Sequence, residues 1–175
     1  MGLCGPSVIG MTTTSTQNTQ SVPVRLDFDS QAPEFARALV QLDRAAITQL
    51  DRVDFDPRLR ELVRLRASQL NGCAYCIDMH SIDARAVGET ERRLYSLPAW
   101  RETGFFTDRE RAALRFTESV TMLATDHVPT AEYDAVAEHF TATEIAALLS
   151  LIVTINAWNA ISVSTRTWQP GSYEP

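Results

Sequence analysis

Residues 61–80 read ELVRLRASQLNGCAYCIDMH, and this stretch decides the predicted fold of the 175-residue chain. Just upstream, Asp56 is a typical N-cap and Pro57 suits the first position of a helix. Leucines and valine then recur at helical spacing until Asn71-Gly72, a pair typical of a turn or a helix C-cap. We therefore predict one helix over residues 57–71 and a second over residues 73–87.

The rest of the chain carries further helix signals and no sustained strand alternation. The capping boxes Thr107–Glu110 and Thr141–Glu144 each begin a helix. Residues 97–104 are the longest predicted loop. We expect an all-α fold, a single-domain helical bundle of six to seven helices. The predicted helices cover residues 31–50, 57–71, 73–87, 89–95, 107–124, 130–140 and 141–164.

Length and composition indicate one domain with loose ends. The first 24 residues carry no charged side chain, and much of this region is polar and low in complexity. We predict a disordered tail over residues 1–23, a helical domain over 24–165 and a C-terminal tail over 166–175.

Charge and hydropathy argue against nucleic acid and membrane as partners of this chain. The chain has 16 basic and 22 acidic residues, a net charge of −6, which argues against nucleic acid. The apolar stretch 144–164 is long enough to test as a membrane span, but Asn156 and Asn159 favour a buried core or interface helix. We expect no membrane partner. The start lacks the basic region of a secretory signal, so we expect a cytoplasmic protein.

The cluster within residues 73–80 carries the chemistry. On a helix, Cys73, Cys76 and His80 share one face. Thiols at a helix N-terminus ionise more readily than free thiols, and a histidine one turn away can take up the proton. If the two predicted helices fold back as a hairpin, Glu61 can reach His80 and orient its ring, as in a catalytic triad.

Two other interpretations of the same residues stay open. The cysteines could be small buried side chains. The pair and His80 could also supply three metal ligands, with Glu61, His127 or His139 as the fourth. A cysteine pair in a chain with few cysteines otherwise indicates redox chemistry in a reducing compartment.

The run from Glu61 to His80 resembles the core motif of the AhpD-like alkylhydroperoxidases, within the carboxymuconolactone decarboxylase family. That motif is a glutamate, eleven residues, Cys-x-x-Cys, three residues and a histidine, and every spacing matches here. The resemblance continues through Glu110-Arg-Ala-Ala-Leu and the stretch 155–159, INAWN, and covers roughly residues 25–165. Decarboxylases of this family generally lack the cysteine pair.

The resemblance implies an AhpD-like fold, a homo-oligomer and a thiol-dependent peroxidase or disulfide oxidoreductase that needs no cofactor or metal. Cys76 would attack the hydroperoxide substrate, Cys73 would resolve it as a disulfide, and Glu61 with His80 would relay the proton. An external dithiol would be the reductant.

One position departs from the family pattern. The best-studied type of member has a histidine immediately before the second cysteine, where this chain has Tyr75. Because tyrosine is a poor base near neutral pH, we expect weaker peroxidase turnover or a different reductant. The departure also favours a second hypothesis, a helical oligomer whose cysteine pair senses redox state or binds metal without turnover.

Overall fold

The computed structural model describes residues 22–175, and within this range every regular element is a helix. The all-α prediction is confirmed. The elements are more numerous than predicted, because two four-residue helices and a 3₁₀-helix over the expected loop join the longer ones. The predicted tail over residues 1–23 lies outside the described residues, apart from its last two. The elements are α1 Phe28–Gln31, α2 Pro33–Arg52, α3 Pro57–Asn71, α4 Ala74–Ala86, α5 Glu91–Ser96, η1 Leu97–Glu102, α6 Asp108–Thr121, α7 Leu123–Asp126, α8 Thr130–Ala137 and α9 Ala142–Thr165.

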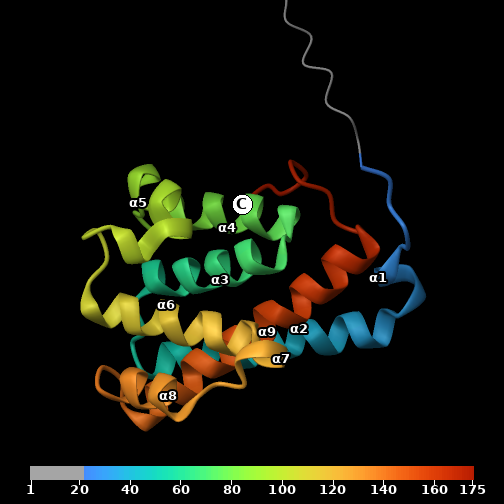
Figure 1. The fold of residues 1–175 in the computed structure, drawn as a ribbon. Coiled ribbons are helices and arrows are strands. Elements are labelled where there is room, and N and C mark those ends of the chain that lie inside the picture. Colours follow the sequence, from blue (N-terminus) through green and yellow to red (C-terminus); the bar gives the residue numbers. More distant parts are fainter. Residues whose placement is uncertain (1–21) are drawn as a thin grey trace, which may run out of the picture.

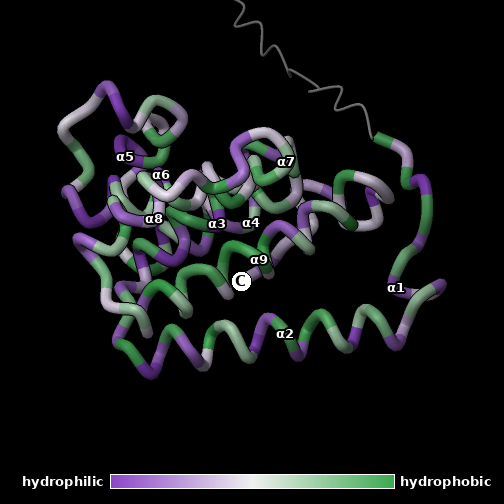
Figure 2. Tube along the Cα trace, turned by 60° about the horizontal axis from the view of Figure 1, so that its bottom comes forward, coloured by the Kyte–Doolittle hydropathy of each residue, from purple (hydrophilic) through white to green (hydrophobic). Residues whose placement is uncertain are grey.

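The apolar helix α9 is the central element of the bundle. It packs against α2, α3 and α6 (Figure 1), and Leu148, Leu151 and Ile152 are fully buried. Among the described helices, α9 alone is long and apolar enough to cross a membrane, but half of its most apolar window is buried within the protein. α2 lies along the outer edge of the molecule and alternates hydrophobic and hydrophilic residues along its length (Figure 2).

The predicted hairpin of α3 and α4 forms through local signals. Asp56 caps α3 by accepting a hydrogen bond from the Arg58 N–H at 2.8 Å, and Pro57 is the first helical residue. Gly72 ends α3 in the left-handed conformation, with φ 68° and ψ 31°. A residue with a side chain is strained in this conformation, which explains a glycine at the turn. Cys73 follows at once as the N-cap of α4.

A partly buried polar network ties this turn to α9. The Asn71 amide donates to the side-chain oxygens of Asn156 at 2.8 Å and Asn159 at 3.0 Å. The Asn159 amide donates in turn to the Ser68 hydroxyl at 3.1 Å, and Asn156 donates to Thr121 on α6 at 3.1 Å. The two asparagines of the apolar helix are therefore satisfied within the chain, and they fix the position where α4 begins.

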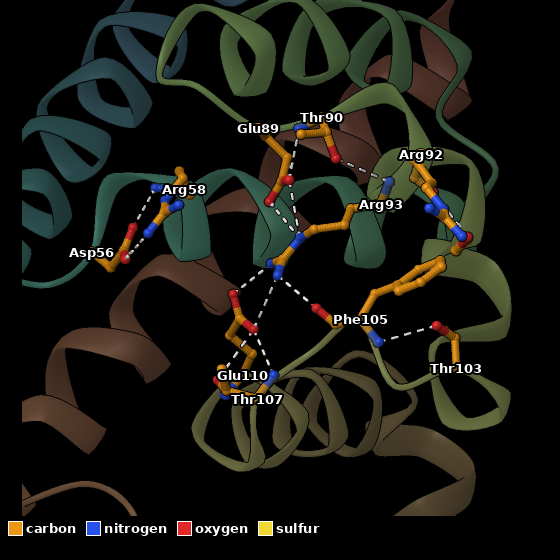
Figure 3. A network of polar contacts seen from close by, with 11 residues as sticks. Asp56, Arg58, Glu89, Thr90, Arg92, Arg93, Thr103, Phe105, Thr107 and Glu110 are labelled. Atoms are coloured by element: carbon orange, nitrogen blue, oxygen red, sulfur yellow. Dashed lines mark hydrogen bonds and ion pairs between the residues drawn. The ribbon is translucent and has the colours of Figure 1, made fainter.

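A second polar network joins α5 and the loops beside it to α6 (Figure 3). Arg93 lies at its centre and donates to Glu89 at 3.1 Å and to the Phe105 carbonyl oxygen at 2.7 Å, and it also pairs with Glu110. Glu110 is the same residue that closes the predicted capping box with Thr107. The network draws on α5, α6 and the loops beside them, so its role is to close this side of the bundle.

Residues 166–175, predicted as a C-terminal tail, follow α9 without a further helix and cross to α4 (Figure 1). The Gly171 N–H donates to Asp78 at 2.7 Å, and the Tyr173 hydroxyl donates to Asp83 at 2.8 Å. This segment therefore packs onto the helix that carries the cysteine pair.

Candidate active site

The cysteine pair lies at the N-terminus of α4. Cys73 is the N-cap of α4 and so lies just before the first turn, whereas we had expected it within that turn. Its sulfur accepts a hydrogen bond from the Cys76 N–H at 3.4 Å. Cys76 is the third residue of the helix. The two sulfurs are bonded as a disulfide, with Cα atoms 5.4 Å apart. Both cysteines are buried, at 1 and 2 per cent exposure, so reagents reach them only through neighbouring pockets.

Glu61 and His80 meet across the hairpin, the arrangement that we expected if the two helices folded back on each other. The Nδ1 atom of His80 lies 2.9 Å from Oε2 of Glu61, and both side chains are buried. The Arg64 guanidinium donates to Oε1 of Glu61 at 2.7 Å. Burial raises the pKa of the Glu61 carboxyl, but the hydrogen bond with His80 and the charge of Arg64 outweigh it, so the pKa lies below its usual range. Glu61 is therefore a carboxylate that can orient and stabilise a protonated imidazole.

Sequence reasoning missed two charged members of this site. Arg64 was not singled out from the sequence, and it pairs with Glu61 and, at 3.8 Å, with Asp43 of α2. Asp83 was not singled out, and its Oδ2 lies 4.0 Å from Nδ1 of His80. Each stands three residues after a predicted site residue, Glu61 or His80. Because residues three apart share a helix face, this spacing was the available signal.

Cys76 and His80 border the same pocket, whose volume is about 580 Å³. Helices α2, α4 and α9 supply most of its lining, and the apolar part of that lining includes Val40, Ile47, Met79 and Ile155. Cys73 does not line this pocket. It borders a separate pocket of about 250 Å³. Of the two cysteines, Cys76 is thus the one that borders the same pocket as His80.

Three aromatic rings form one side of the pocket. The ring centroids of Tyr75 and Trp168 lie 6.0 Å apart, and those of Trp168 and Trp158 lie 5.3 Å apart. Burial, and then the charges of Asp78 and Asp83, raise the pKa of the Tyr75 phenol, so it stays protonated near neutral pH. Trp158 is partly exposed and also lines the pocket.

The residues considered as metal ligands are partly separated. Within residues 22–175, one group of three potential ligands has its atoms within 4.8 Å of one another: Glu61, His80 and Asp83. Neither cysteine belongs to it, and neither does His127 or His139. The Arg64 guanidinium on Glu61 already neutralises the carboxylate that a cation would need.

Comparison with known proteins assigns this chain to a family. The model of the carboxymuconolactone decarboxylase family matches residues 33–119, a range that contains Glu61, Cys73, Cys76 and His80. The uncharacterized protein YdfG of Bacillus subtilis strain 168 is 38% identical over 140 residues, which cover 80% of this chain and 92% of YdfG.

Solved structures agree with this match. ATU0492 of Agrobacterium tumefaciens, a protein of unknown function assigned provisionally to the antioxidant defence protein AhpD, superposes with a TM-score of 0.79 at 32% identity. The match covers 85% of this chain and 99% of that one. A peroxidase-related protein from Ralstonia eutropha JMP134, described as an alkylhydroperoxidase AhpD core, shares the fold with a TM-score of 0.64 at 18% identity, over 82% of this chain and 74% of that one. The chain therefore belongs to the carboxymuconolactone decarboxylase family and is one of its AhpD-like members.

Proposed function

We propose that the protein is a thiol-dependent peroxidase that reduces hydroperoxides through the Cys73–Cys76 pair. The observation that carries the proposal is the shared pocket: Cys76 and His80 border the same space, and His80 is hydrogen-bonded to the buried Glu61. Membership of a family with peroxidase-related members supports an enzyme of this kind. The proposal includes a homo-oligomer in the reducing cytoplasm.

The first half of the cycle oxidises the pair. The Cys76 thiolate attacks the terminal oxygen of the hydroperoxide, so that an S–O bond forms while the O–O bond breaks. The alkoxide leaves as an alcohol after it takes a proton from the His80 imidazolium, whose charge Glu61 stabilises. Cys73 then attacks the sulfenic acid of Cys76, and hydroxide leaves as water as the disulfide forms.

The second half restores both thiols. An external dithiol exchanges with the disulfide, gives up two electrons and two protons, and becomes a disulfide itself. Either sulfur of the protein could be attacked, but the pocket of about 580 Å³ favours Cys76. The peroxide and the reductant would thus use the same opening in turn.

Thiol counting tests the cycle directly. The count is made in a Cys4→Ser background, so that it refers to the pair alone. One equivalent of an organic hydroperoxide should remove two thiols from the reduced protein. Cys73→Ser should lose one thiol and give a sulfenic acid that dimedone traps, whereas Cys76→Ser should lose none. Full steady-state turnover by Cys76→Ser, with dithiothreitol as donor, would refute the assignment of the attacking sulfur.

The rival hypothesis is a redox sensor or metal-binding oligomer without turnover. A sensor would form the disulfide once and turn over slowly with dithiothreitol, which the steady-state assay separates from a peroxidase. A metal site at Glu61, His80 and Asp83 would retain stoichiometric metal in protein purified without chelator. The Arg64 guanidinium beside Glu61 argues against that outcome.

A further inference from the structure

Trp168 is fixed in place by contacts with three parts of the fold. Its indole N–H donates to Asp29 at the start of the bundle at 3.0 Å. Its ring meets Tyr75 of α4 and Trp158 of α9. Because the indole N–H is hydrogen-bonded and the ring packs against two other aromatic rings, the Trp168 side chain has a fixed orientation and presents a rigid aromatic surface.

The segment that carries Trp168 is also attached to α4 at two further points. The Gly171 N–H donates to Asp78, one helical turn from Tyr75, and the Tyr173 hydroxyl donates to Asp83, three residues after His80. Residues 166–175 therefore run alongside the helix that bears the cysteine and the histidine. This arrangement places the Trp168 ring in the lining of the pocket that Cys76 opens into.

The chemistry of the pocket indicates what it takes up. Aromatic rings and apolar side chains make up most of its lining surface, and the rest includes the charged side chains of Asp29, Arg37, Asp43, Arg64 and Asp83. Its volume of about 580 Å³ lies within the range of small-molecule sites and far exceeds the space that hydrogen peroxide needs. An apolar guest would displace water from these rings, and a flat guest would also stack on them.

We propose that this aromatic wall binds the organic group of the substrate, so that the protein acts on hydroperoxides with an aromatic or compact apolar group, and that Trp168 determines this specificity. The inference rests on the proposed peroxidase function and names its substrate class. It also gives Tyr75 a physical role. At the position before the second cysteine, a ring that packs against Trp168 contributes to binding in place of a base.

The first test compares two peroxides. For Trp168→Ala, kcat/KM with cumene hydroperoxide should fall at least about tenfold, because one aromatic partner is lost, whereas kcat/KM with hydrogen peroxide should stay within about twofold. Trp168→Phe keeps a ring and should recover most of the discrimination. Tyr95→Ala removes an exposed aromatic ring outside the pocket and should change neither value. Equal losses with both peroxides in Trp168→Ala would overturn the assignment.

The second test measures binding without turnover. Isothermal titration of the oxidised protein with 2-phenylpropan-2-ol, the product alcohol, should give a dissociation constant at least about tenfold weaker in Trp168→Ala than in the wild type. Peroxidase turnover without any such binding would overturn this inference and leave the proposed function in place. Binding that depends on Trp168, without turnover, would refute the peroxidase function and retain the aromatic site.

Discussion

Replacing Glu61 with glutamine tests the proton relay, because it keeps the side-chain shape and removes the charge. Oε2 of Glu61 lies 2.9 Å from Nδ1 of His80, and Oε1 accepts from Arg64 at 2.7 Å. A guanidinium can only donate, so the glutamine oxygen must face Arg64 and its NH₂ group must face His80. The Nδ1 atom then has to accept a hydrogen bond, and the neutral ring carries its proton on Nε2.

The effect of Glu61→Gln on the rate depends on which ring nitrogen of His80 is free to accept a proton. With Glu61 in place, Nδ1 carries the proton and Nε2 is free to take one, which in the proposed cycle comes from Cys76. In the glutamine variant Nε2 is already protonated. The same exchange of carboxylate for amide in catalytic triads costs about 10⁴ in kcat, and general base catalysis contributes about 10²–10⁴. We expect kcat/KM for a hydroperoxide to fall by about 10²–10⁴, which corresponds to roughly 3–5 kcal/mol.

Stopped-flow measurement of the first turnover isolates this step from reduction by the dithiol. The matched control is Glu118→Gln. Glu118 is similarly buried and accepts hydrogen bonds from Arg66 and Trp100, but it does not contact the cysteine pair. This variant should lose stability and keep its rate per folded molecule. A rate for Glu61→Gln within threefold of the wild type, or an equal loss in the control, would refute the relay.

Three further predictions concern stability and titration. Asn159→Ala should lower the free energy of unfolding by about 2–4 kcal/mol, because a fully buried side chain loses both of its hydrogen bonds. Urea denaturation measures this change. In the control Ser164→Ala, which alters an exposed side chain, the free energy of unfolding should change by no more than about 0.5 kcal/mol. The pKa of the Tyr173 phenol is raised to about 12 from 10.0, mainly by the hydrogen bond to Asp83 and secondly by burial. This contact therefore stabilises the fold fully below pH 10, and its contribution is lost as the pH rises through 12. Ultraviolet titration should show one phenol that ionises near pH 12, and Tyr173→Phe should lack it. Thr141→Ala removes a capping box and should cost about 1 kcal/mol, measured by thermal unfolding at matched pH.

The hairpin that brings Glu61 to His80 was predictable because its signals are local. An N-cap, a proline, a glycine at the turn and a run of apolar residues each act within a few residues of where they stand. Both capping boxes predicted from the sequence, at Thr107 and Thr141, are present in the structure. Such motifs satisfy backbone groups that no distant part of the chain would satisfy as readily.

Contacts between distant segments were not predictable in the same way. Tyr173 and Asp83 lie 90 residues apart in sequence, and no pattern around either residue indicates the other. Residues 166–175 are mostly polar and carry two prolines and a glycine, which by themselves are typical of a loose end. The segment is held by side chains of other elements, so its position depends on the completed bundle. Trp168 was missed for this reason.

The two sulfurs are unequal in a way that fits the proposed order of events. Cys73 caps the helix and its sulfur accepts the Cys76 N–H, so a thiolate there is stabilised by the helix N-terminus and is a good leaving group. Cys76 shares a pocket with His80, so in the proposed cycle incoming molecules would meet this cysteine. A dithiol that attacks Cys76 would expel Cys73 as the capped thiolate. In the proposed cycle, the helix start would therefore serve the reductive half, and the Glu61–His80 pair would serve the oxidative half.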